Sequence, residues 1–467
     1  MMKNYDVVVI GAGPGGYVAA EEAAKYGQSV AIIEKQYLGG TCLNSGCIPS
    51  KTLLRHSEII ELMEKAKSWG IEFENVKLSF GKMMNRKTKV IEQLRNGVLS
   101  LLNKAKVDIY YGIASILENK QIVIESESKT DEIFANKIII ATGSKPNIPP
   151  INGIENVFYH TSDSIFDIQD IPKSIAIIGG GIIGVEFACV FSALNVEVTI
   201  IEMADQLLVS EDEDVASMIT KKFKKDKVKI ITSAKVQEIS ESKDGILINV
   251  HTNDGNRLFI QADELLLATG RIPNLSAVSR LNVLMNGPFL AVNKQMETSI
   301  PNVYAIGDVI GGWQLAHVAS AEGIVAASNA SGIFKEINYK AVPRCVYSSP
   351  EIASVGLTEK EAREKGNAVR TETFPLSAIG KALAMDERTG FIKLIADETY
   401  GEILGVVMLG PHVTEMISEA SSLIFLEATV DELALLIHPH PTLSEGLWEA
   451  ARNWLVNRRK ATAVVAK

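Results

Sequence analysis

The chain has 467 residues and a formal net charge of −9, and 46% of its residues are hydrophobic. This length is sufficient for about three domains of ordinary size. Basic and acidic residues are mixed along the chain without a basic stripe or tail, which makes nucleic acid and anionic membrane surfaces poor partners.

Cysteine is scarce, with four residues in the whole chain, so a secreted protein held together by disulfides is disfavoured. The apolar stretch 174–194 is nearly long enough to span a membrane, but it contains three consecutive glycines and Glu186. A strand, a turn and a helix account for both features. We therefore expect a cytoplasmic protein without a membrane span.

Two segments of the chain have the same pattern, 5–35 and 173–203. Each reads as a short apolar strand, a glycine-rich turn, a helix and a second apolar strand that ends in glutamate. The glutamate follows the first glycine by 23 positions in both copies (34 − 11 and 202 − 179). The match predicts two copies of one βαβ unit, and hence two nucleotide-binding domains.

A second pair of similar segments, 137–147 and 264–274, places an apolar strand before Ala-Thr-Gly and a proline-containing exit. Each segment is expected to close its own domain, and the stretch 144–154 reads as a linker. The strand-like run 302–309 suggests that the chain then returns to the first domain.

After about residue 345 the pattern changes to mixed strands and helices. It predicts a strand at 401–410 and amphipathic helices at 413–428 and 443–458. The predicted domains are a first nucleotide domain, a second one, a return to the first and a C-terminal domain, at residues 1–145, 146–272, 273–344 and 345–467.

The glycine motifs predict dinucleotide binding. In each motif the first glycine makes a tight turn, the second lets the backbone approach a pyrophosphate, and the third packs the helix close to the strand. The glycines are Gly11, Gly13 and Gly16 in the first copy and Gly179, Gly181 and Gly184 in the second. A single such motif is often only a glycine-rich turn, but two with matched acidic residues favour binding sites.

The two glutamates that end the second strands, Glu34 and Glu202, stand where a carboxylate would accept hydrogen bonds from an adenosine ribose. No arginine directly follows Glu202, which favours NAD over NADP. Two sites in one chain suggest FAD in one and a nicotinamide cofactor in the other.

The stretch "CLNSGC" contains Cys42 and Cys47, which are five positions apart. In a regular helix their Cα atoms would be about 8.5 Å apart, whereas a disulfide needs at most about 6.8 Å. The segment therefore cannot be an ideal helix if the two are bonded. Gly46 permits the distortion, and Pro49 is tolerated if the helix starts near Ile48.

Three interpretations of this pair stay open: a redox couple, plain cysteines, or part of a zinc site. A thiol at a helix N-terminus is acidified, which favours redox chemistry, and a zinc site lacks a second cluster of ligands. The other two cysteines, Cys189 and Cys345, read as small buried apolar residues.

The stretch "HPHPTLSE" places His440 and Glu445 five positions apart across a Pro-Thr turn. The carboxylate could accept a hydrogen bond from Nδ1 and fix the tautomer, leaving Nε2 free to take a proton. A plain helix cap, with Thr442 or Ser444 as the capping residue, explains the same residues equally well.

Taken together, these motifs closely resemble the pyridine nucleotide–disulfide oxidoreductases, and most of all their dihydrolipoamide dehydrogenase group. The resemblance covers essentially the whole chain through GAGPGGYVAA, GGTCLNSGCIPSK, GGGIIGVE, ATGRIPN, YAIGDV, LAHVA and HPTLSE. One departure is Ser45, where valine is common in the family. The resemblance implies an α/β fold with two Rossmann-like dinucleotide-binding domains and a C-terminal α+β dimerisation domain.

The resemblance also implies roles for individual residues. It assigns to catalysis Cys42, Cys47, Lys51, Glu186, His440 and Glu445, with Glu186 as the charge partner of Lys51. It assigns to FAD binding Gly11, Gly13, Gly16, Glu34, Thr41, Lys51, Gly112, Thr142, Gly143, Asp308 and Ala316. It assigns to NAD binding Gly179, Gly181, Ile182, Ile183, Gly184, Glu202, Val236, Ala268 and Gly270.

By this resemblance the enzyme is a homodimer that oxidises protein-bound dihydrolipoamide and reduces NAD⁺, with FAD between them and no metal. Cys42 would exchange with substrate, and Cys47 would face the flavin. The implied partners are the lipoyl domains and the acyltransferase core of a 2-oxo acid dehydrogenase-type, acetoin or glycine cleavage complex. The alternatives are glutathione or mercuric reductase within the family, a single-cysteine NADH oxidase, and a non-catalytic nucleotide-binding protein.

Overall fold

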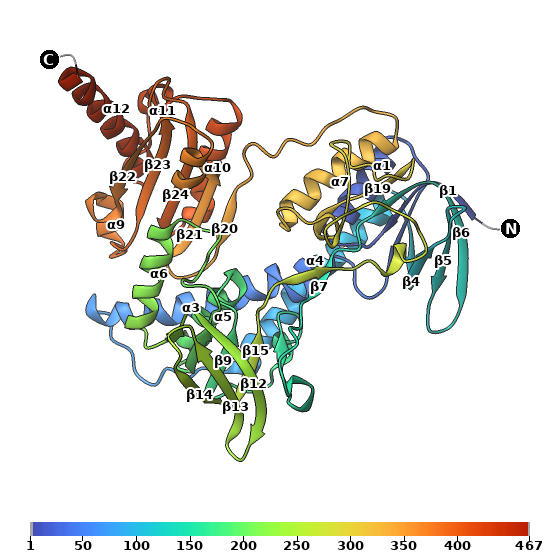
Figure 1. The fold of residues 1–467 in the computed structure, drawn as a ribbon, viewed down its shortest axis with the longest axis horizontal. Helices are drawn as coiled ribbons and strands as arrows, with labels where there is room; N and C mark the ends of the chain where they lie inside the picture. Colours follow the sequence, from blue (N-terminus) through green and yellow to red (C-terminus); the bar gives the residue numbers. More distant parts are fainter. Residues whose placement is uncertain (1–2, 466–467) are drawn as a thin grey trace.

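The computed structural model describes residues 3–465 as an α/β protein built around three principal sheets. Figure 1 shows the N-terminal part on the right, the green central part below, and the C-terminal part on the upper left. None of the described helices is long and apolar enough to cross a membrane.

The first sheet has the strand order β3-β2-β1-β6-β5-β4, and β19 also pairs with β6. Its parallel half is the predicted βαβ unit, because α1 (Pro14–Lys25) connects β1 to β2. The strands are β1 (Lys3–Ile10), β2 (Val30–Glu34), β3 (Asp108–Tyr111), β4 (Ile113–Ile116), β5 (Gln121–Glu125), β6 (Thr130–Ile140) and β19 (Val303–Ala305).

The chain returns to this sheet after the second domain. The three residues of β19 pair in parallel with the end of β6, and α7 (Ala316–Ala330) then packs along α1. The two helices lie so close that a Cβ on Gly323 would come within 2.5 Å of the carbonyl oxygen of Gly15. The predicted return to the first domain is therefore present.

The second parallel sheet has the order β11-β10-β9-β15-β8 and repeats the βαβ unit through α5 (Ile182–Ala193). A three-stranded antiparallel sheet, β12-β13-β14, lies beside it, and α6 (Glu213–Lys225) follows β10. The strands are β8 (His160–Thr161), β9 (Ser174–Ile178), β10 (Glu197–Ile201), β11 (Lys229–Ile231), β12 (Ala234–Ser242), β13 (Gly245–Thr252), β14 (Arg257–Ala262) and β15 (Glu264–Leu267).

The two nucleotide domains are joined by a reciprocal contact between β7 (Ser144–Pro146) and β16 (Arg271–Pro273). These strands follow the two Ala-Thr-Gly segments and pair antiparallel. The Oγ1 atoms of Thr142 and Thr269 each donate to a carbonyl of the opposite segment, at 2.7 and 2.8 Å. The predicted linker at 144–154 therefore begins as a paired strand.

The C-terminal sheet is antiparallel, with the order β20-β21-β24-β23-β22. Its helices include α10 (Val413–Phe425), α11 (Val430–Leu435) and α12 (Glu445–Val465), and Trp454 of α12 is fully buried against it. The strands are β20 (Arg344–Val346), β21 (Glu351–Gly356), β22 (Val369–Pro375), β23 (Phe391–Asp397) and β24 (Ile403–Gly410). The predicted strand at 401–410 and both predicted helices are present.

Three helices lie between β2 and β3 in the chain: α2 (Gly40–Ser45), α3 (Cys47–Ser68) and α4 (Phe80–Lys104). In Figure 1, α3 runs through the middle of the molecule and beside α5 of the second domain. The smaller elements are α8 (Glu359–Glu364), α9 (Gly380–Ala384) and the hairpin of β17 (Met285–Asn286) with β18 (Phe289–Leu290).

Candidate active site

The glycine loops show which of their residues are dictated by packing and which by a ligand. A Cβ on Gly11 or Gly16 would meet a backbone oxygen at 2.2 or 1.9 Å, so packing within the chain excludes a side chain there. A Cβ on Gly13 would meet no atom closer than 4.0 Å. Packing does not require this second glycine, whereas a pyrophosphate lying on the N-terminus of α1 would.

The second loop repeats this pattern. A Cβ on Gly179 or Gly184 would meet backbone oxygens at 2.3 and 2.0 Å, whereas one on Gly181 has nothing within 4 Å. Ile182 and Ile183 begin α5 directly after this glycine. Both loops therefore fit a dinucleotide whose phosphates approach the bare second glycine.

The two predicted ribose-binding carboxylates are held in the same way. Glu34 accepts the backbone N–H of Ala12 at 2.8 Å and that of Gln36 at 2.9 Å. Glu202 accepts the N–H groups of Gly180 and Ala204, at 2.5 and 2.7 Å. Each carboxylate therefore fixes the conformation of its own glycine loop, and its contact with an adenosine ribose stays a prediction.

Asp308 lies in the turn after β19 and is connected to the second domain. The Ser144 hydroxyl donates to Asp308 Oδ2 at 2.5 Å and accepts from Arg271 Nε at 2.7 Å. Arg271 also donates to Asp163 at 2.8 Å. Asp308, predicted to bind FAD, is thus linked directly to Ser144 and, through Ser144, to Arg271 of the second segment, a connection that the sequence did not indicate.

The remaining predicted cofactor residues lie around the two loops. Thr41 lies in α2, Ala316 begins α7, and Gly112 donates its N–H to the Glu34 carbonyl at 2.9 Å. The second domain places Val236 in β12 and Ala268 at the end of β15. Their cofactor roles stay predictions.

The two cysteines lie on separate helices. Cys42 belongs to α2 and Cys47 begins α3, so no single helix spans both. Gly46 breaks the helix between them, and a Cβ there would lie 2.9 Å from the Thr41 oxygen and 3.3 Å from the Cys42 Cα. The predicted distortion at Gly46 is present, and α3 starts one residue before the predicted Ile48.

Both cysteines are free thiols, and the hydrogen bond between them makes them unequal. Donation from Cys42 and, to a smaller extent, the positive charge of Lys51 lower the pKa of Cys47 to about 7 against the effect of burial. The same hydrogen bond and burial raise the pKa of Cys42. A helix N-terminus also favours a thiolate, so Cys47 is the more readily ionised member of the pair.

Lys51 lies one turn after Cys47 and forms the predicted ion pair with Glu186. Its Nζ lies 2.9 Å from both carboxylate oxygens. The sequence did not indicate a third member, Tyr347, whose N–H donates to Glu186 at 3.0 Å and whose ring lies 4.5 Å below Lys51 Nζ. Tyr347 belongs to the C-terminal domain, so three parts of the chain meet at this charge pair.

His440 and Glu445 are paired, with 2.8 Å between Nδ1 and Oε1. The second carboxylate oxygen accepts the N–H of Thr442 at 2.8 Å, so Glu445 also serves the turn that opens α12. The His440 side chain is 77% exposed. Figure 1 places α11 and α12 away from the start of α3, and the described chain shows no contact between His440 and its own cysteines.

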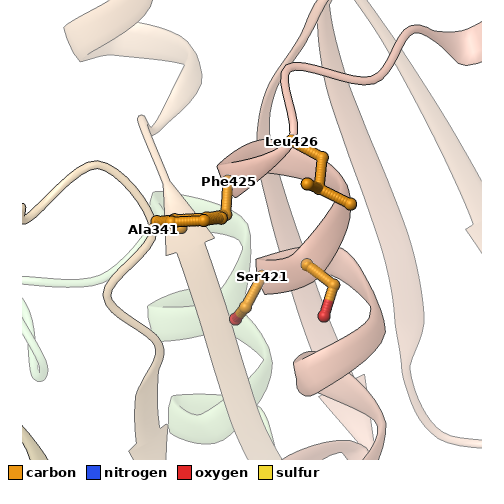
Figure 2. A pocket seen from close by; sticks show the side chains of 5 residues that line it. Ala341, Ser421, Phe425 and Leu426 are labelled. Atoms are coloured by element: carbon orange, nitrogen blue, oxygen red, sulfur yellow. The ribbon is translucent and has the colours of Figure 1, made fainter.

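A pocket of about 360 Å³ lies on α10, apart from these groups. Figure 2 shows Ser421 and Phe425 of α10 lining it together with Ala341 and with Leu426, which directly follows the helix. The Phe425 and Leu426 side chains are largely exposed, and it contains none of the predicted catalytic residues.

Two family models match the chain almost from end to end. Residues 5–323 match pyridine nucleotide-disulphide oxidoreductase, and residues 342–451 match the dimerisation domain of the same proteins. The chain belongs to this family. Its dimerisation domain carries the exposed Leu435 and Ile437 beside the His440 turn, which supports the predicted homodimer.

Curated relatives resemble this family member over its whole length. A dihydrolipoyl dehydrogenase of Bacillus subtilis is 42% identical, covering 97% of this chain and 98% of its own. One of Chlamydia trachomatis is 38% identical and covers 97% of each chain.

Solved structures have the same fold. One is the Cu(II) complex of the HOCl-induced flavoprotein disulfide reductase RclA from Escherichia coli, with a TM-score of 0.87 and 30% identity over 97% of this chain and 100% of that one. Another is LpdA of Mycobacterium tuberculosis, with a TM-score of 0.89 and 26% identity over 97% and 99% of the two chains.

These matches confirm four of the predictions from sequence. The family, the fold class and the enzyme class, an oxidoreductase, are as predicted. So are the cofactors, FAD and NAD, which the two glycine loops also fit.

Proposed function

We propose that this enzyme oxidises protein-bound dihydrolipoamide to lipoamide and reduces NAD⁺ to NADH through a redox-active pair, Cys42 and Cys47. The inequality of the two adjacent thiols supports this proposal most directly, because their mutual hydrogen bond lowers the pKa of Cys47 and raises that of Cys42. The 42% identity to a dihydrolipoyl dehydrogenase over nearly the whole chain supports the choice of substrate.

In the first half of the reaction, the oxidised enzyme carries the Cys42–Cys47 disulfide. His440, delivered by the partner subunit and oriented by Glu445, takes the proton of one dihydrolipoamide thiol. The resulting thiolate attacks the sulfur of Cys42, and the S–S bond breaks with Cys47 leaving as thiolate. The second substrate thiol then displaces Cys42 and gives its proton to the departing Cys42 sulfur, which releases lipoamide and leaves both electrons on the cysteine pair.

In the second half, FAD supplies the two-electron chemistry that connects the cysteine pair to NAD⁺. Lys51 and the N-terminus of α3 hold positive charge beside the Cys47 sulfur, and Glu186 keeps Lys51 in place. The FAD-binding residues proposed here are Gly11, Gly13, Gly16, Glu34, Thr41, Gly112, Thr142, Gly143, Asp308 and Ala316. Those proposed for NAD are Gly179, Gly181, Ile182, Ile183, Gly184, Glu202, Val236, Ala268 and Gly270.

The proposed physiological partners follow from this substrate. Dihydrolipoamide arises on the swinging lipoyl domains of an acyltransferase core, so we propose that the homodimer works in the cytoplasm beside a complex of that kind. No metal or nucleic acid takes part in the proposed reaction.

The test is a comparison of kinetic constants. Purified protein should retain FAD and reduce NAD⁺ with dihydrolipoamide at a kcat/KM far above that for glutathione disulfide with NADPH. The carboxylate of Glu202 would repel a 2′-phosphate, so NADP⁺ should be a poor substitute for NAD⁺. A clear preference for glutathione disulfide and NADPH would contradict the proposal.

A further inference from the structure

A short polar chain holds the helix that carries Cys42. Asn44 lies between the two cysteines, and its Nδ2 donates to the carbonyls of Leu38 and Gly40 at 3.0 and 2.8 Å. Its Oδ1 accepts from Arg95 at two nitrogens, Nε at 3.1 Å and Nη2 at 2.7 Å. The carboxamide thus connects the redox loop to α4, 51 residues further along the chain.

Arg95 is itself held by an aromatic ring. Its guanidinium carbon lies 4.0 Å from the centre of the Tyr37 ring. A planar guanidinium that stacks on a ring and grips one oxygen with two nitrogens has little freedom left. Tyr37 lies at the start of the loop to which Asn44 is hydrogen-bonded, so Arg95 contacts this part of the chain at two points, Tyr37 and Asn44.

The helix α2 needs such support because it is only six residues long. Helices of this length are unstable by themselves in water, since nucleation is costly and few hydrogen bonds repay it. Its first residue also packs against the first glycine loop, because a Cβ on Gly40 would lie 2.6 Å from the Cα of Gly13. Movement of α2 would therefore displace Cys42 from Cys47.

We propose that Arg95 is a positioning residue for the redox pair: through Asn44 and Tyr37 it holds α2 where the Cys42 sulfur meets that of Cys47. The inference rests on the proposed redox function of these cysteines. Arg95 is proposed to fix the position of α2, whereas Cys42 and Lys51 are the groups that lower the pKa of Cys47.

The first measurement is the reactivity of Cys42 in the FAD-containing full-length protein. The pair is reduced with dithiothreitol, which is oxidised to its cyclic disulfide, and the protein is alkylated with iodoacetamide. Peptide mass spectrometry then gives the ratio of alkylation at Cys42 to alkylation at the half-buried Cys345, which is the internal reference. We expect Arg95→Ala to raise this ratio about fivefold, the factor that corresponds to one lost hydrogen bond.

The second measurement is the Cys42–Cys47 equilibrium in mixtures of reduced and oxidised glutathione, where forming the protein disulfide reduces one glutathione disulfide to two thiols. A loosened α2 lowers the effective concentration of one thiol at the other, so Arg95→Ala should disfavour the protein disulfide by about fivefold. A role of Arg95 in the stability of α4 alone would lower the melting temperature without changing this equilibrium or the alkylation ratio.

Matched variants make the test specific. Arg95→Lys keeps the charge but loses the planar fork, so it should behave like Arg95→Ala, and it decides the question if the alanine variant fails to fold. Asn44→Ala should act in the same direction, and the effects of Asn44→Ala and Arg95→Ala should be less than additive in the double variant, because the two side chains share one contact. The control is Arg86→Ala, an exposed arginine of the same helix, which should match the wild type.

Two failures can be told apart. If the wild-type pair forms no reversible disulfide with glutathione, the proposed function is wrong. If the wild type does form it, and both Arg95 variants match it in ratio and equilibrium, the positioning role of Arg95 is wrong while the proposed function stands.

Discussion

Lys51 Nζ lies 2.9 Å from both carboxylate oxygens of Glu186, a residue 135 positions further along the chain. Lys51 belongs to the helix that begins at Cys47, whereas Glu186 belongs to α5 of the second nucleotide domain. The two charges have opposite effects on the Cys47 thiol, since Lys51 lowers its pKa and Glu186 raises it. The pair therefore adjusts the ionisation of Cys47 and fixes one domain against the other.

Replacing Lys51 should make Cys47 harder to ionise. We expect Lys51→Ala to raise the pKa of Cys47 above its value of about 7, because a cation that favours the thiolate is removed. The thiolate absorbance of the reduced protein, followed against pH, measures this shift. A pKa unchanged in Lys51→Ala would show that Cys42 and the helix N-terminus suffice.

The hydrogen bond from Cys42 is the largest cause of the low Cys47 pKa. Serine at position 42 keeps a donor and alanine does not, so the pKa of Cys47 should be higher in Cys42→Ala than in Cys42→Ser. Both variants should lose turnover of dihydrolipoamide. Cys42→Ser should still show a long-wavelength absorbance band with oxidised FAD, which appears as pH rises through the Cys47 pKa; its absence would argue against the assigned order of the thiols.

Alanine substitutions at two glycines of the first loop should have different effects, one on FAD binding and one on stability. Gly13→Ala should fold normally and lose FAD, because its Cβ meets nothing closer than 4.0 Å until a pyrophosphate is bound. Gly16→Ala should destabilise the fold itself by more than ~2 kcal/mol, because its Cβ would lie 1.9 Å from the Gly11 oxygen. Thermal unfolding and FAD content, measured together, separate the two; equal stability of both variants would contradict the packing argument.

Replacing Glu445 by glutamine should weaken the proposed base. Glutamine cannot present two acceptor oxygens, so it cannot serve both His440 Nδ1 and the Thr442 N–H as Glu445 does. We expect dihydrolipoamide oxidation to fall roughly 10²-fold. Ferricyanide reduction by NADH, which bypasses the base, is the control; a similar loss in that assay would mean that the substitution damages the cofactor site.

The same pair has a defined dependence on pH. The hydrogen bond with His440 lowers the pKa of the Glu445 carboxyl. The stability that the ionised Glu445 gives to the His440 turn is therefore fully present at pH values above the ordinary carboxyl pKa. This stability is lost as the pH falls through the lowered pKa of Glu445 in the folded protein. In the wild type the His440 turn should therefore stay ordered at pH values where an unpaired glutamate is already half protonated, and hydrogen exchange of the Thr442 amide reports it.

The sequence predicted those parts of the site that local pattern controls. The two βαβ units, their glutamates and the break at Gly46 all follow from short-range spacing and steric rules. The prediction that Cys189 is buried is confirmed at 5% exposed, but Cys345, predicted buried, is only half-buried in β20. Position 345 lies near the start of the C-terminal sheet, where local pattern says little about burial.

Contacts between distant segments were not predictable in this way. Nothing near Tyr347 indicates that its N–H reaches Glu186, 161 residues away, and nothing near Arg95 indicates Asn44. Such contacts depend on how separate elements pack. The pairing of Lys51 with Glu186 was anticipated because the family resemblance supplied the long-range information that residue spacing lacks.

The contact between β7 and β16 is symmetric between the two repeats. Lys145 opposes Ile272, which holds the equivalent place in the other repeat, and the Asn147 and Asn274 amides donate to the glycine carbonyls of the opposite Ala-Thr-Gly segments. Reciprocal contacts of this kind are the mark of an isologous interface, in which two identical surfaces meet across a two-fold axis. The seam between the nucleotide domains therefore has local two-fold character inside one polypeptide, so equivalent substitutions in the two Ala-Thr-Gly segments act on the same seam from opposite sides.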